Sequence, residues 1–325
     1  MVRAVIVYVV DWLVILGTIV FAGSLSLWVK PAARPFSLGD PSIAFPFQTK
    51  TKISTGLLVG LSGLLPVVVC LLLTLFVPTT STPSGSGWKR KIYAANKAIL
   101  GLGLSVGLAL LFTDSLKNLM GKPRPDMLSR CQPIVNRRSL PAGSTIGEGL
   151  FTWNICATKQ TTGSPSSDLL DGFRSFPSGH ASMAFSGLTY TTLFLASFVF
   201  SMTLPFARKV RPFAATATAT VSAAPTAQPK FPQMLAFLIV SIPMWIAIYI
   251  ASTRWSDFRH HGFDVLFGSF EGIVCALIGW SWYGVYSCRR GGMFQSTDTT
   301  MESPGIDGDD GDVESQPVGK GPVGF

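Results

Sequence analysis

The sequence predicts an all-α fold, a polytopic membrane bundle of six transmembrane helices with a site at one membrane face. Composition is the first observation behind this prediction. Of the 325 residues, 48% are hydrophobic and only 13% are charged, which is too apolar for a water-soluble domain of this length. The second is that the chain offers six apolar stretches near the roughly 20 residues that a helix needs to cross a bilayer core about 30 Å thick. The third is that the few histidines fall at the ends of these stretches.

The predicted spans account for most of the chain, and residues 1–290 form one membrane domain. The spans run from about Val5 to Trp28, Ile53 to Val77, Ile92 to Thr113, Ala181 to Leu204, Met234 to Ala251 and Phe263 to Tyr286. The first is a retained signal anchor, because its apolar part is long and lacks a clear small-residue cleavage site. Residues 205–230, rich in Ala, Thr and Pro, predict a flexible cytosolic linker. Residues 291–325, rich in Gly, Asp and Ser, predict a disordered tail.

An even number of spans places both termini on one face and the loops after spans one, three and five on the other. The raw count of Lys and Arg favours the loop face as cytosolic, but the long loop after the third span exceeds the length over which the positive-inside rule operates. With that loop set aside, the termini are predicted to be cytosolic and the loop face lumenal or extracellular. The vacuole, Golgi, endoplasmic reticulum and plasma membrane all remain open.

Charge and cysteine content exclude several partners. The net charge of +9 is spread without a long basic run or a nucleic-acid motif, so anionic lipid or phosphate is the expected partner and nucleic acid is not. The five cysteines match no paired Cys-x-x-Cys pattern, so no structural metal is expected. Cys131 and Cys156 share the long loop, where a disulfide and two free thiols are both open.

The three histidines, His180, His260 and His261, lie on the same predicted face at the mouths of helices. A lone histidine is usually a surface or satisfied core residue, but this clustering indicates chemistry. Asp264 follows His260 by four residues, so in a helix its carboxylate would lie one turn away and fix the ring tautomer. Arg254 precedes His260 by six residues and has the forked guanidinium suited to phosphate. The alternative is that these charges form only interfacial ion pairs.

Two cations lie where the third span ends. Lys117 and Arg124 are separated by Gly121 and Pro123, which break the helix, so the chain turns and can bring both cations toward one point. The alternative is simple anchoring to lipid headgroups.

A turn suited to phosphate precedes the fourth span, with the sequence Pro177-Ser178-Gly179-His180. The Ser178 hydroxyl and free amides at a helix start can donate to an anion, and Gly179 lets the backbone come close to it. His180 is then placed to protonate a leaving oxygen. The alternative is a turn that merely starts a helix.

Together the three motifs, Lys117-x6-Arg124-Pro125, Pro177-Ser178-Gly179-His180 and Arg254-x5-His260-x3-Asp264, resemble the signature of the type 2 phosphatidic acid phosphatase superfamily. The resemblance covers about Asp114 to Gly268 plus the six-span pattern. The run from Arg254 to His261 is similar to the eukaryotic lipid phosphate phosphatases, including fungal diacylglycerol pyrophosphate phosphatases. One position departs from the pattern, because Thr253 stands where the family usually has serine; a hydroxyl is kept.

The resemblance implies a lipid phosphate phosphatase of phospholipid metabolism that needs no metal or cofactor. His260 would attack phosphorus and form a phosphohistidine, Asp264 would orient its ring, and His180 would protonate the leaving group and then activate water. The implied phosphate-binding groups are Lys117, Arg124, Ser178, the amide of Gly179 and Arg254. Phosphatidate, lysophosphatidate and diacylglycerol pyrophosphate are the implied substrates, with sphingoid and isoprenyl phosphates as alternatives.

Three other classes compete with this interpretation. A catalytically inactive lipid-binding or scaffold member would keep the fold, but the complete motif set argues against it. A transporter or channel would explain the intramembrane acids Asp11 and Glu271, yet cations and histidines clustered at one face suit a site better than a pathway. The vanadium haloperoxidases share the motifs by resemblance but are soluble. The sequence does not indicate an oligomeric state.

Overall fold

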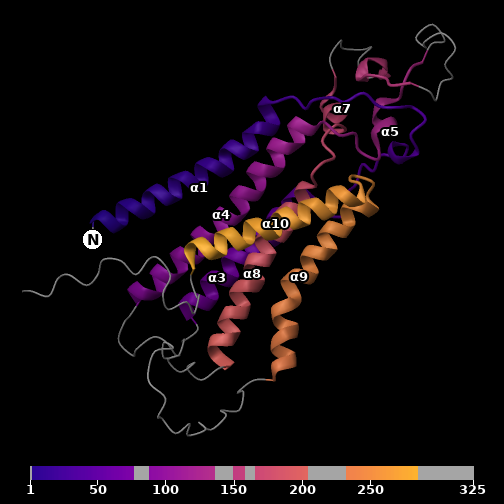
Figure 1. The fold of residues 1–325 in the computed structure, drawn as a ribbon. Coiled ribbons are helices and arrows are strands. Elements are labelled where there is room, and N and C mark those ends of the chain that lie inside the picture. The colour runs from indigo at the N-terminus through magenta and orange to yellow at the C-terminus, as the bar shows by residue number, and fades with distance from the viewer. Residues whose placement is uncertain (1, 77–87, 136–148, 158–164, 204–231, 285–325) are drawn as a thin grey trace, which may run out of the picture. The chain divides into compact units, whose positions relative to one another are not determined.

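The computed structural model describes residues 2–76, 88–135, 149–157, 165–203 and 232–284 (Figure 1). These residues belong to one unit, Met1–Ser287. The predicted linker at 205–230 and the predicted tail at 291–325 lie outside the described residues.

The described part of the chain is helical and contains no β-strand, only two isolated β-bridges. Six helical spans are long and apolar enough to cross a membrane, which confirms the predicted all-α, six-span fold. They are α1 (Val2–Trp28), α2 with a π turn and α3 (Thr55–Val59, Gly60–Leu64 and Leu65–Phe76), α4 (Trp88–Met120), α8 (Gly179–Thr203), α9 (Gln233–Ser256) and α10 (Gly262–Tyr283).

Two helices extend further than hydropathy predicts. The third span continues to Met120 instead of Thr113, and the fifth to Ser256 instead of Ala251. Hydropathy falls where charged residues begin, whereas backbone hydrogen bonds continue the helix beyond the apolar part. Lys117 and Arg254 therefore lie on helical last turns, where the backbone fixes their directions.

Helix α8 forms the centre of the bundle and packs against α4, α9 and α10, while α1 packs on α4 (Figure 1). Of the six spans, α8 is the most buried and α1 the least. The buried face of α8 is rich in small residues, including Ala181, Ser182, Ala184 and Ser186, which allow neighbouring helices to approach closely.

Glycines on α10 set its distance from α8. A Cβ added at Gly268 would lie 2.6 Å from the carbonyl oxygen of Ser178, and one at Gly272 would lie 2.4 Å from that of Ser182. A residue larger than glycine therefore fits at neither position unless the backbone of α8 or α10 moves. This contact fixes the start of α10 against the start of α8.

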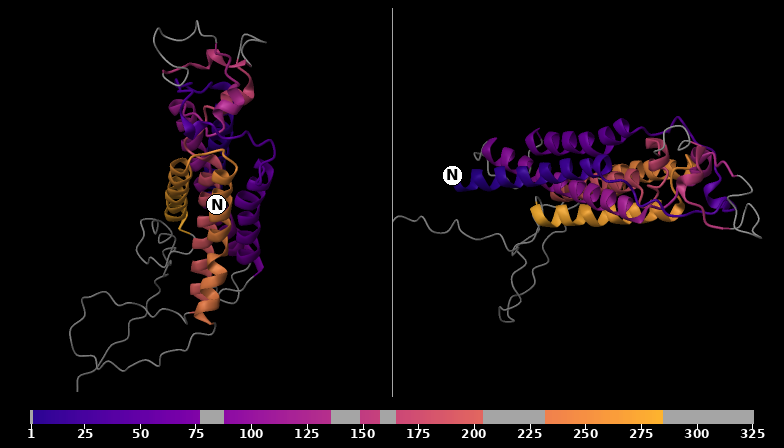
Figure 2. Two further views of the ribbon diagram at one scale, coloured as in Figure 1. Left: turned by 90° about the vertical axis from the view of Figure 1, so that its right-hand side faces the viewer. Right: turned by 90° about the horizontal axis from the view of Figure 1, so that it is seen from above.

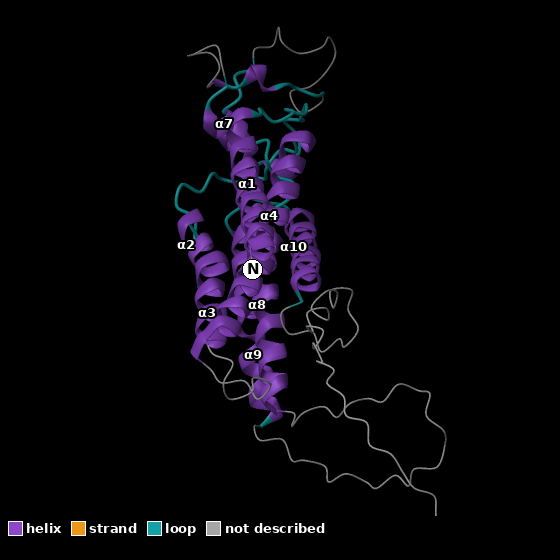
Figure 3. Cartoon of the chain, turned by 90° about the vertical axis from the view of Figure 1, so that its left-hand side faces the viewer, coloured by secondary structure: helices purple, strands orange, loops and turns teal. Residues whose placement is uncertain are grey.

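Two loops form a separate layer, here called the cap, made of the described parts of residues 29–54 and 121–177. It includes the short helices α5 (Met127–Cys131) and α7 (Ser167–Asp171) and the 3₁₀ turns Pro41–Ile43 and Trp153–Ile155. Figures 2 and 3 show these loops and short helices gathered at the end of the bundle away from the N-terminus.

The cap has its own apolar core and its own cross-links. Backbone bridges join Phe36 to Phe151 and Pro133 to Cys156, and a disulfide joins Cys131 to Cys156. Its buried cluster is distinct from that of the helices and includes Phe36, Ile43, Met127, Leu169 and Phe173. The cap is thus a small packed layer that covers the helix ends.

Candidate active site

The residues of the three motifs meet where the helix ends face the cap. Lys117 and Arg254 lie on the last turns of α4 and α9, and Asp264 lies on the first turn of α10. The charges of Lys117 and Arg124 act on both His180 and His260, so all three motifs contribute to one polar centre.

The chain turns sharply after Lys117 because of Gly121. This residue has a φ of +57° and lies against the Ala32 carbonyl, which a Cβ would approach to 1.2 Å. Only glycine fits this backbone and this space. The turn sends Arg124 back over the helix ends, as the break at Gly121 and Pro123 predicts.

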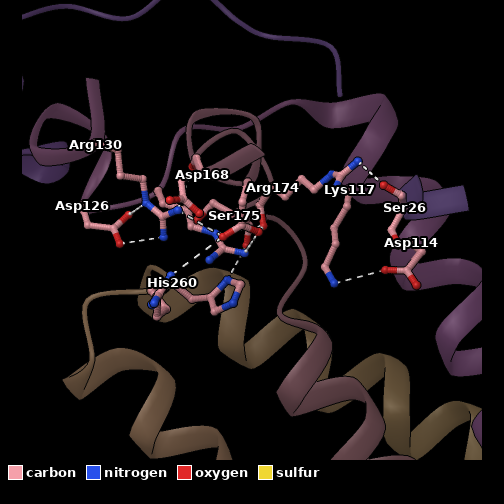
Figure 4. Close-up of polar contacts among 12 residues, drawn as sticks. Ser26, Asp114, Lys117, Asp126, Arg130, Asp168, Arg174, Ser175 and His260 are labelled. Carbon is pink, nitrogen blue, oxygen red and sulfur yellow. Dashed lines mark hydrogen bonds and ion pairs between the residues drawn. The ribbon is translucent and has the colours of Figure 1, made fainter. Parts of the chain in front are cut away.

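His260 lies in the loop between α9 and α10, and its side chain is buried. Its Nδ1 is 2.6 Å from the backbone carbonyl oxygen of Ser175 (Figure 4). A carbonyl only accepts, so Nδ1 carries the proton and the lone pair of the neutral ring is on Nε2. That tautomer is the one a nucleophilic imidazole needs.

Asp264 does not hold the His260 ring directly, contrary to the prediction. Helix α10 begins at Gly262 with His261 as its N-cap, so His260 is outside the helix and the expected one-turn spacing does not apply. The Asp264 carboxylate instead accepts from Lys122 Nζ at 2.7 Å and from Ser175 Oγ at 2.6 Å. It also accepts from the His261 amide at 3.1 Å. Asp264 therefore reaches His260 through Ser175, whose carbonyl holds the ring.

The start of α8 carries two polar atoms with no partner among the described residues. Ser178 Oγ and His180 Nε2 are buried and make no hydrogen bond. The Ser178 amide donates to the Asp264 carbonyl, which ties the start of α8 to that of α10. Buried unpaired polar atoms are rare, so these two mark a place for a polar ligand.

Lys117 points toward the start of α8. Its Nζ is 3.2 Å from Asp114 Oδ1 and lies so close to Gly179 that a Cβ there would be 2.5 Å away (Figure 4). Glycine at position 179 thus lets the ammonium group and the backbone meet at one point.

The two motif arginines are each braced by a carboxylate. Arg254 Nη2 donates to Asp257 Oδ2, and Arg124 Nη2 donates to Asp171 Oδ1, both at 2.9 Å. In each guanidinium the Nε also has a protein acceptor, Thr253 Oγ1 for Arg254 and the Arg174 carbonyl for Arg124. Each arginine therefore keeps Nη1 without a protein hydrogen bond among the described residues, available to an anion.

A cavity of about 50 Å³ opens beside Lys117 and Arg124. It has room for a few water molecules. Its other lining residues are Ser26, Asp114, Asn118, Asp171 and Arg174. Arg174 donates to the carbonyl oxygens of Ser26 and Val29 at the end of α1, which joins this wall to the first helix.

Burial and positive charge keep His260 neutral. Burial lowers its pKa well below the usual value, and the neighbouring charge of Arg124 lowers it further. The ring is therefore unprotonated at neutral pH. A neutral imidazole among several cations is a competent nucleophile toward an anionic phosphorus group, and the cations offset the charge of that group.

Four polar residues of the site escaped the sequence interpretation: Lys122, Asp171, Ser175 and Asp257. Lys122 lies between the two cations of the first motif and Ser175 lies three residues before Ser178, so proximity to the motifs was the available signal. Asp257 had the same signal, because it lies within the third motif, three residues after Arg254. Asp171 had no such signal, because it is recognised only by the arginine that it contacts. Among the described residues, no group of three or more His, Cys, Asp or Glu side chains is arranged to hold a metal ion.

Comparison with known proteins gives a consistent result. The family model described as the PAP2 superfamily matches residues 98–287. Diacylglycerol pyrophosphate phosphatase 1 of Saccharomyces cerevisiae is 30% identical over 250 residues, which cover 76% of this chain and 70% of the yeast protein. The probable diacylglycerol pyrophosphate phosphatase 1 of Schizosaccharomyces pombe is 30% identical over 80% of this chain and 77% of its own length. Phospholipid phosphatase 2 of Mus musculus is 28% identical over 78% of this chain and 77% of its own length. No solved structure matches the chain.

Proposed function

Because the chain belongs to the PAP2 superfamily and is a multi-pass membrane lipid phosphate phosphatase, we propose that it cleaves phosphate from its lipid substrate through a phosphohistidine on His260. The observation that supports this most strongly is the hydrogen bond from His260 Nδ1 to the Ser175 carbonyl. It leaves the Nε2 lone pair as the free nucleophile.

In the first step His260 Nε2 forms a bond to phosphorus as the bond from phosphorus to the leaving oxygen breaks. His180 donates a proton to that oxygen, which departs as an alcohol or as the phosphate of the remaining lipid. In the second step His180 takes a proton from water, whose oxygen attacks the phosphohistidine and releases inorganic phosphate. His260 returns to its neutral form.

The charges around the histidines supply the stabilisation that phosphoryl transfer requires. Nη1 of Arg124, Nη1 of Arg254 and Nζ of Lys117 bind the phosphate oxygens, and Ser178 Oγ donates a further hydrogen bond. Phosphoryl transfer depends mainly on positioning and charge neutralisation, so these three cations take the place that a metal ion has in kinases. We therefore propose turnover without a divalent cation.

Diacylglycerol pyrophosphate and phosphatidate are the substrates we propose, with lysophosphatidate as a third. The support is similarity to the two fungal proteins named as diacylglycerol pyrophosphate phosphatases, together with the position of the site at the ends of membrane-spanning helices. A phosphate headgroup lies at that depth in a bilayer while the acyl chains remain among the apolar side chains.

We also infer that the site faces the lumen or the exterior and that both termini face the cytosol. The Cys131–Cys156 disulfide lies in the cap at the same end as the site, and disulfides persist in oxidising compartments. A matched pair of cysteine variants tests this. Leu150→Cys in the cap and Met234→Cys at the start of α9 are both exposed positions. An impermeant maleimide on intact cells or on vesicles of known orientation should label them from opposite sides; the reverse pattern would overturn the assignment.

The test of the function is release of inorganic phosphate from each lipid in detergent micelles with excess EDTA. The intact protein should release phosphate and His260→Ala should not. His261→Asn is the matched comparison at the neighbouring histidine. It removes the 3.2 Å contact of His261 Nδ1 with Asp264 but keeps a good N-cap residue at the start of α10, so activity should fall less than in His260→Ala. Loss of activity in His261→Asn with retention in His260→Ala would reject the nucleophile but keep the phosphatase. No release by folded wild-type protein would contradict the function, and loss of activity in EDTA alone would contradict metal independence.

A further inference from the structure

Three arginine side chains from different parts of the chain converge on one carboxylate, that of Asp171 at the end of α7. Its Oδ1 accepts from Arg124 at 2.9 Å, and its Oδ2 accepts from Arg130 at 3.1 Å and lies 3.8 Å from Arg259 Nη1. Burial opposes ionisation of Asp171, but the arginines outweigh it, and its pKa is lowered from the ordinary value. Asp171 is therefore charged at neutral pH.

Arg130 does not depend on Asp171. It makes two 2.9 Å bonds to Asp126 and a 2.8 Å bond to the Asp168 carbonyl (Figure 4). Its guanidinium also stacks on the Phe47 ring. These contacts would hold Arg130, and the tie between α5 and α7, without the Asp171 carboxylate.

Arg259 is also held by other groups. It donates to the Gln48 carbonyl at 2.8 Å, and its guanidinium lies over the Phe47 ring. Its approach to Asp171 is the longest of the three and lies outside hydrogen-bond range.

Arg124 is the arginine that relies on Asp171. Apart from the 2.9 Å bond to Asp171, its side chain makes only two contacts of 3.4 Å, both to the Arg174 carbonyl. Without the carboxylate the guanidinium would lose its only short hydrogen bond and its only ion pair among the described residues. The same arrangement occurs at Arg254, where Asp257 is the carboxylate.

We propose that Asp171 is a positioning residue that orients Arg124 toward the substrate's phosphate. By binding the Nη2 corner of the guanidinium, it directs the free Nη1 to the centre where Arg124 also acts on His260 and His180. This rests on the proposed function. A misplacement of about 1 Å at such a group can cost about 100-fold in rate, so the carboxylate has a measurable effect without touching the substrate.

The experiment is a double-mutant cycle on Asp171 and Arg124. Asp171→Asn should lower kcat/KM about 10- to 100-fold, while Arg124→Gln should lower it further. In the Arg124→Gln background, Asp171→Asn should cause no additional loss. Asp168→Asn is the matched control, because its side chain is exposed on the same short helix and only its backbone carbonyl binds Arg130; it should be unchanged.

A second readout does not require turnover. Vanadate, which mimics pentacoordinate phosphorus, should raise the thermal unfolding midpoint of the wild type in detergent, and less so that of Asp171→Asn. A wild type that binds vanadate but releases no phosphate would reject the proposed function alone. Wild-type kcat/KM in Asp171→Asn, or equal losses in both Arg124 backgrounds, would overturn the positioning role.

Asp171→Glu covers the case in which Asp171→Asn fails to fold. It keeps the charge and moves it by one methylene, so the fold should remain while kcat/KM falls by an intermediate amount. Full activity in Asp171→Glu, together with an unfolded Asp171→Asn, would show that the charge serves only folding and would overturn the proposal.

Discussion

The site has two halves that are held in different ways. In the helix half, Ser178 and Asp264 are fixed by backbones in contact at the starts of α8 and α10. In the cap half, Arg124 lies in the cap and His260, in the loop before α10, is held by the cap residue Ser175, so both are fixed by hydrogen bonds and ion pairs. Gly268 and Gly272 allow α10 to touch α8 directly. The cap instead holds the Arg124 and His260 side chains through polar contacts between segments far apart in sequence.

The difference indicates how each half should respond to change. Close-packed backbones tolerate almost no added volume, because neither side can move without shifting a whole helix. A polar network loses one contact at a time, and the remaining contacts keep the group near its place. Added volume in the helix half should therefore prevent folding. Loss of a polar contact in the cap half should instead leave the protein folded and lower its turnover rate, by an amount that depends on the contact.

The largest effect is expected from Gly272→Leu. A Cβ at this position would lie 2.4 Å from the Ser182 carbonyl oxygen and 2.9 Å from Phe185 Cβ, so α8 and α10 must separate. We expect little or no monodisperse protein by size-exclusion chromatography in detergent and no phosphate release. Gly23→Ala is the control, because nothing lies within 4 Å of a Cβ there. Normal folding of Gly272→Leu would refute the view that backbone contact holds this half.

A second prediction asks how Asp264 reaches His260. Asp264→Asn places a side-chain amide next to the donors of Lys122, Ser175 and His261, which now bond to the carboxylate. The amide should displace Ser175, and the displaced Ser175 carbonyl should move the His260 ring, so we expect kcat to fall about 100-fold. Ser175→Ala keeps the carbonyl that holds His260 and removes only the hydroxyl bonded to Asp264, so we expect a smaller loss, about 10-fold. The double variant should be no worse than Asp264→Asn. Full activity in Ser175→Ala would show that Asp264 acts by another route.

The same division separates what the sequence predicts from what it does not. The spans and the helix-end residues Lys117, Arg254 and Asp264 follow from hydropathy and motif spacing, because neighbours along a helix are also neighbours in space. The assumption that His260 is helical placed Asp264 one turn from its ring, and this was wrong because α10 begins two residues later.

The braces of the cap could not be predicted from the sequence. The Arg124–Asp171 bond spans 47 positions and the Ser175–Asp264 bond spans 89, and no local pattern specifies either. Many acidic residues were available for each arginine, and only the packing of the cap selects between them. Cap residues such as Asp171 became recognisable as functional only from their contacts.

A third prediction sharpens the comparison within the cap. Replacing Cys131 and Cys156 with serine removes a cross-link of sequence separation 25, for which chain entropy predicts a loss of about 3.5 kcal/mol in the free energy of unfolding. The thermal unfolding midpoint in non-reducing detergent should fall, while the helix bundle keeps its circular dichroism at low temperature. Phosphate release at low temperature should persist, because Arg124 and His260 contact neither cysteine. If the double variant also loses the helical circular dichroism signal at low temperature, the cap and the helix bundle fold as one unit.

The smallest effect concerns pH and comes from His260 in the cap half. Burial, and then the charge of Arg124, lowers its pKa well below 6.5 in the folded protein. In the unfolded chain this histidine protonates near pH 6.5, so below that pH the unfolded state binds more protons and the free energy of unfolding falls as pH falls. The fall should approach about 1.4 kcal/mol per pH unit between pH 6.5 and the folded pKa. The unfolding midpoint of the wild type should therefore decline more steeply from pH 7 to pH 5 than that of His260→Gln. Equal slopes in the two proteins would mean that the folded protein also protonates His260, and the neutral nucleophile would then be wrong at the lower end of this range.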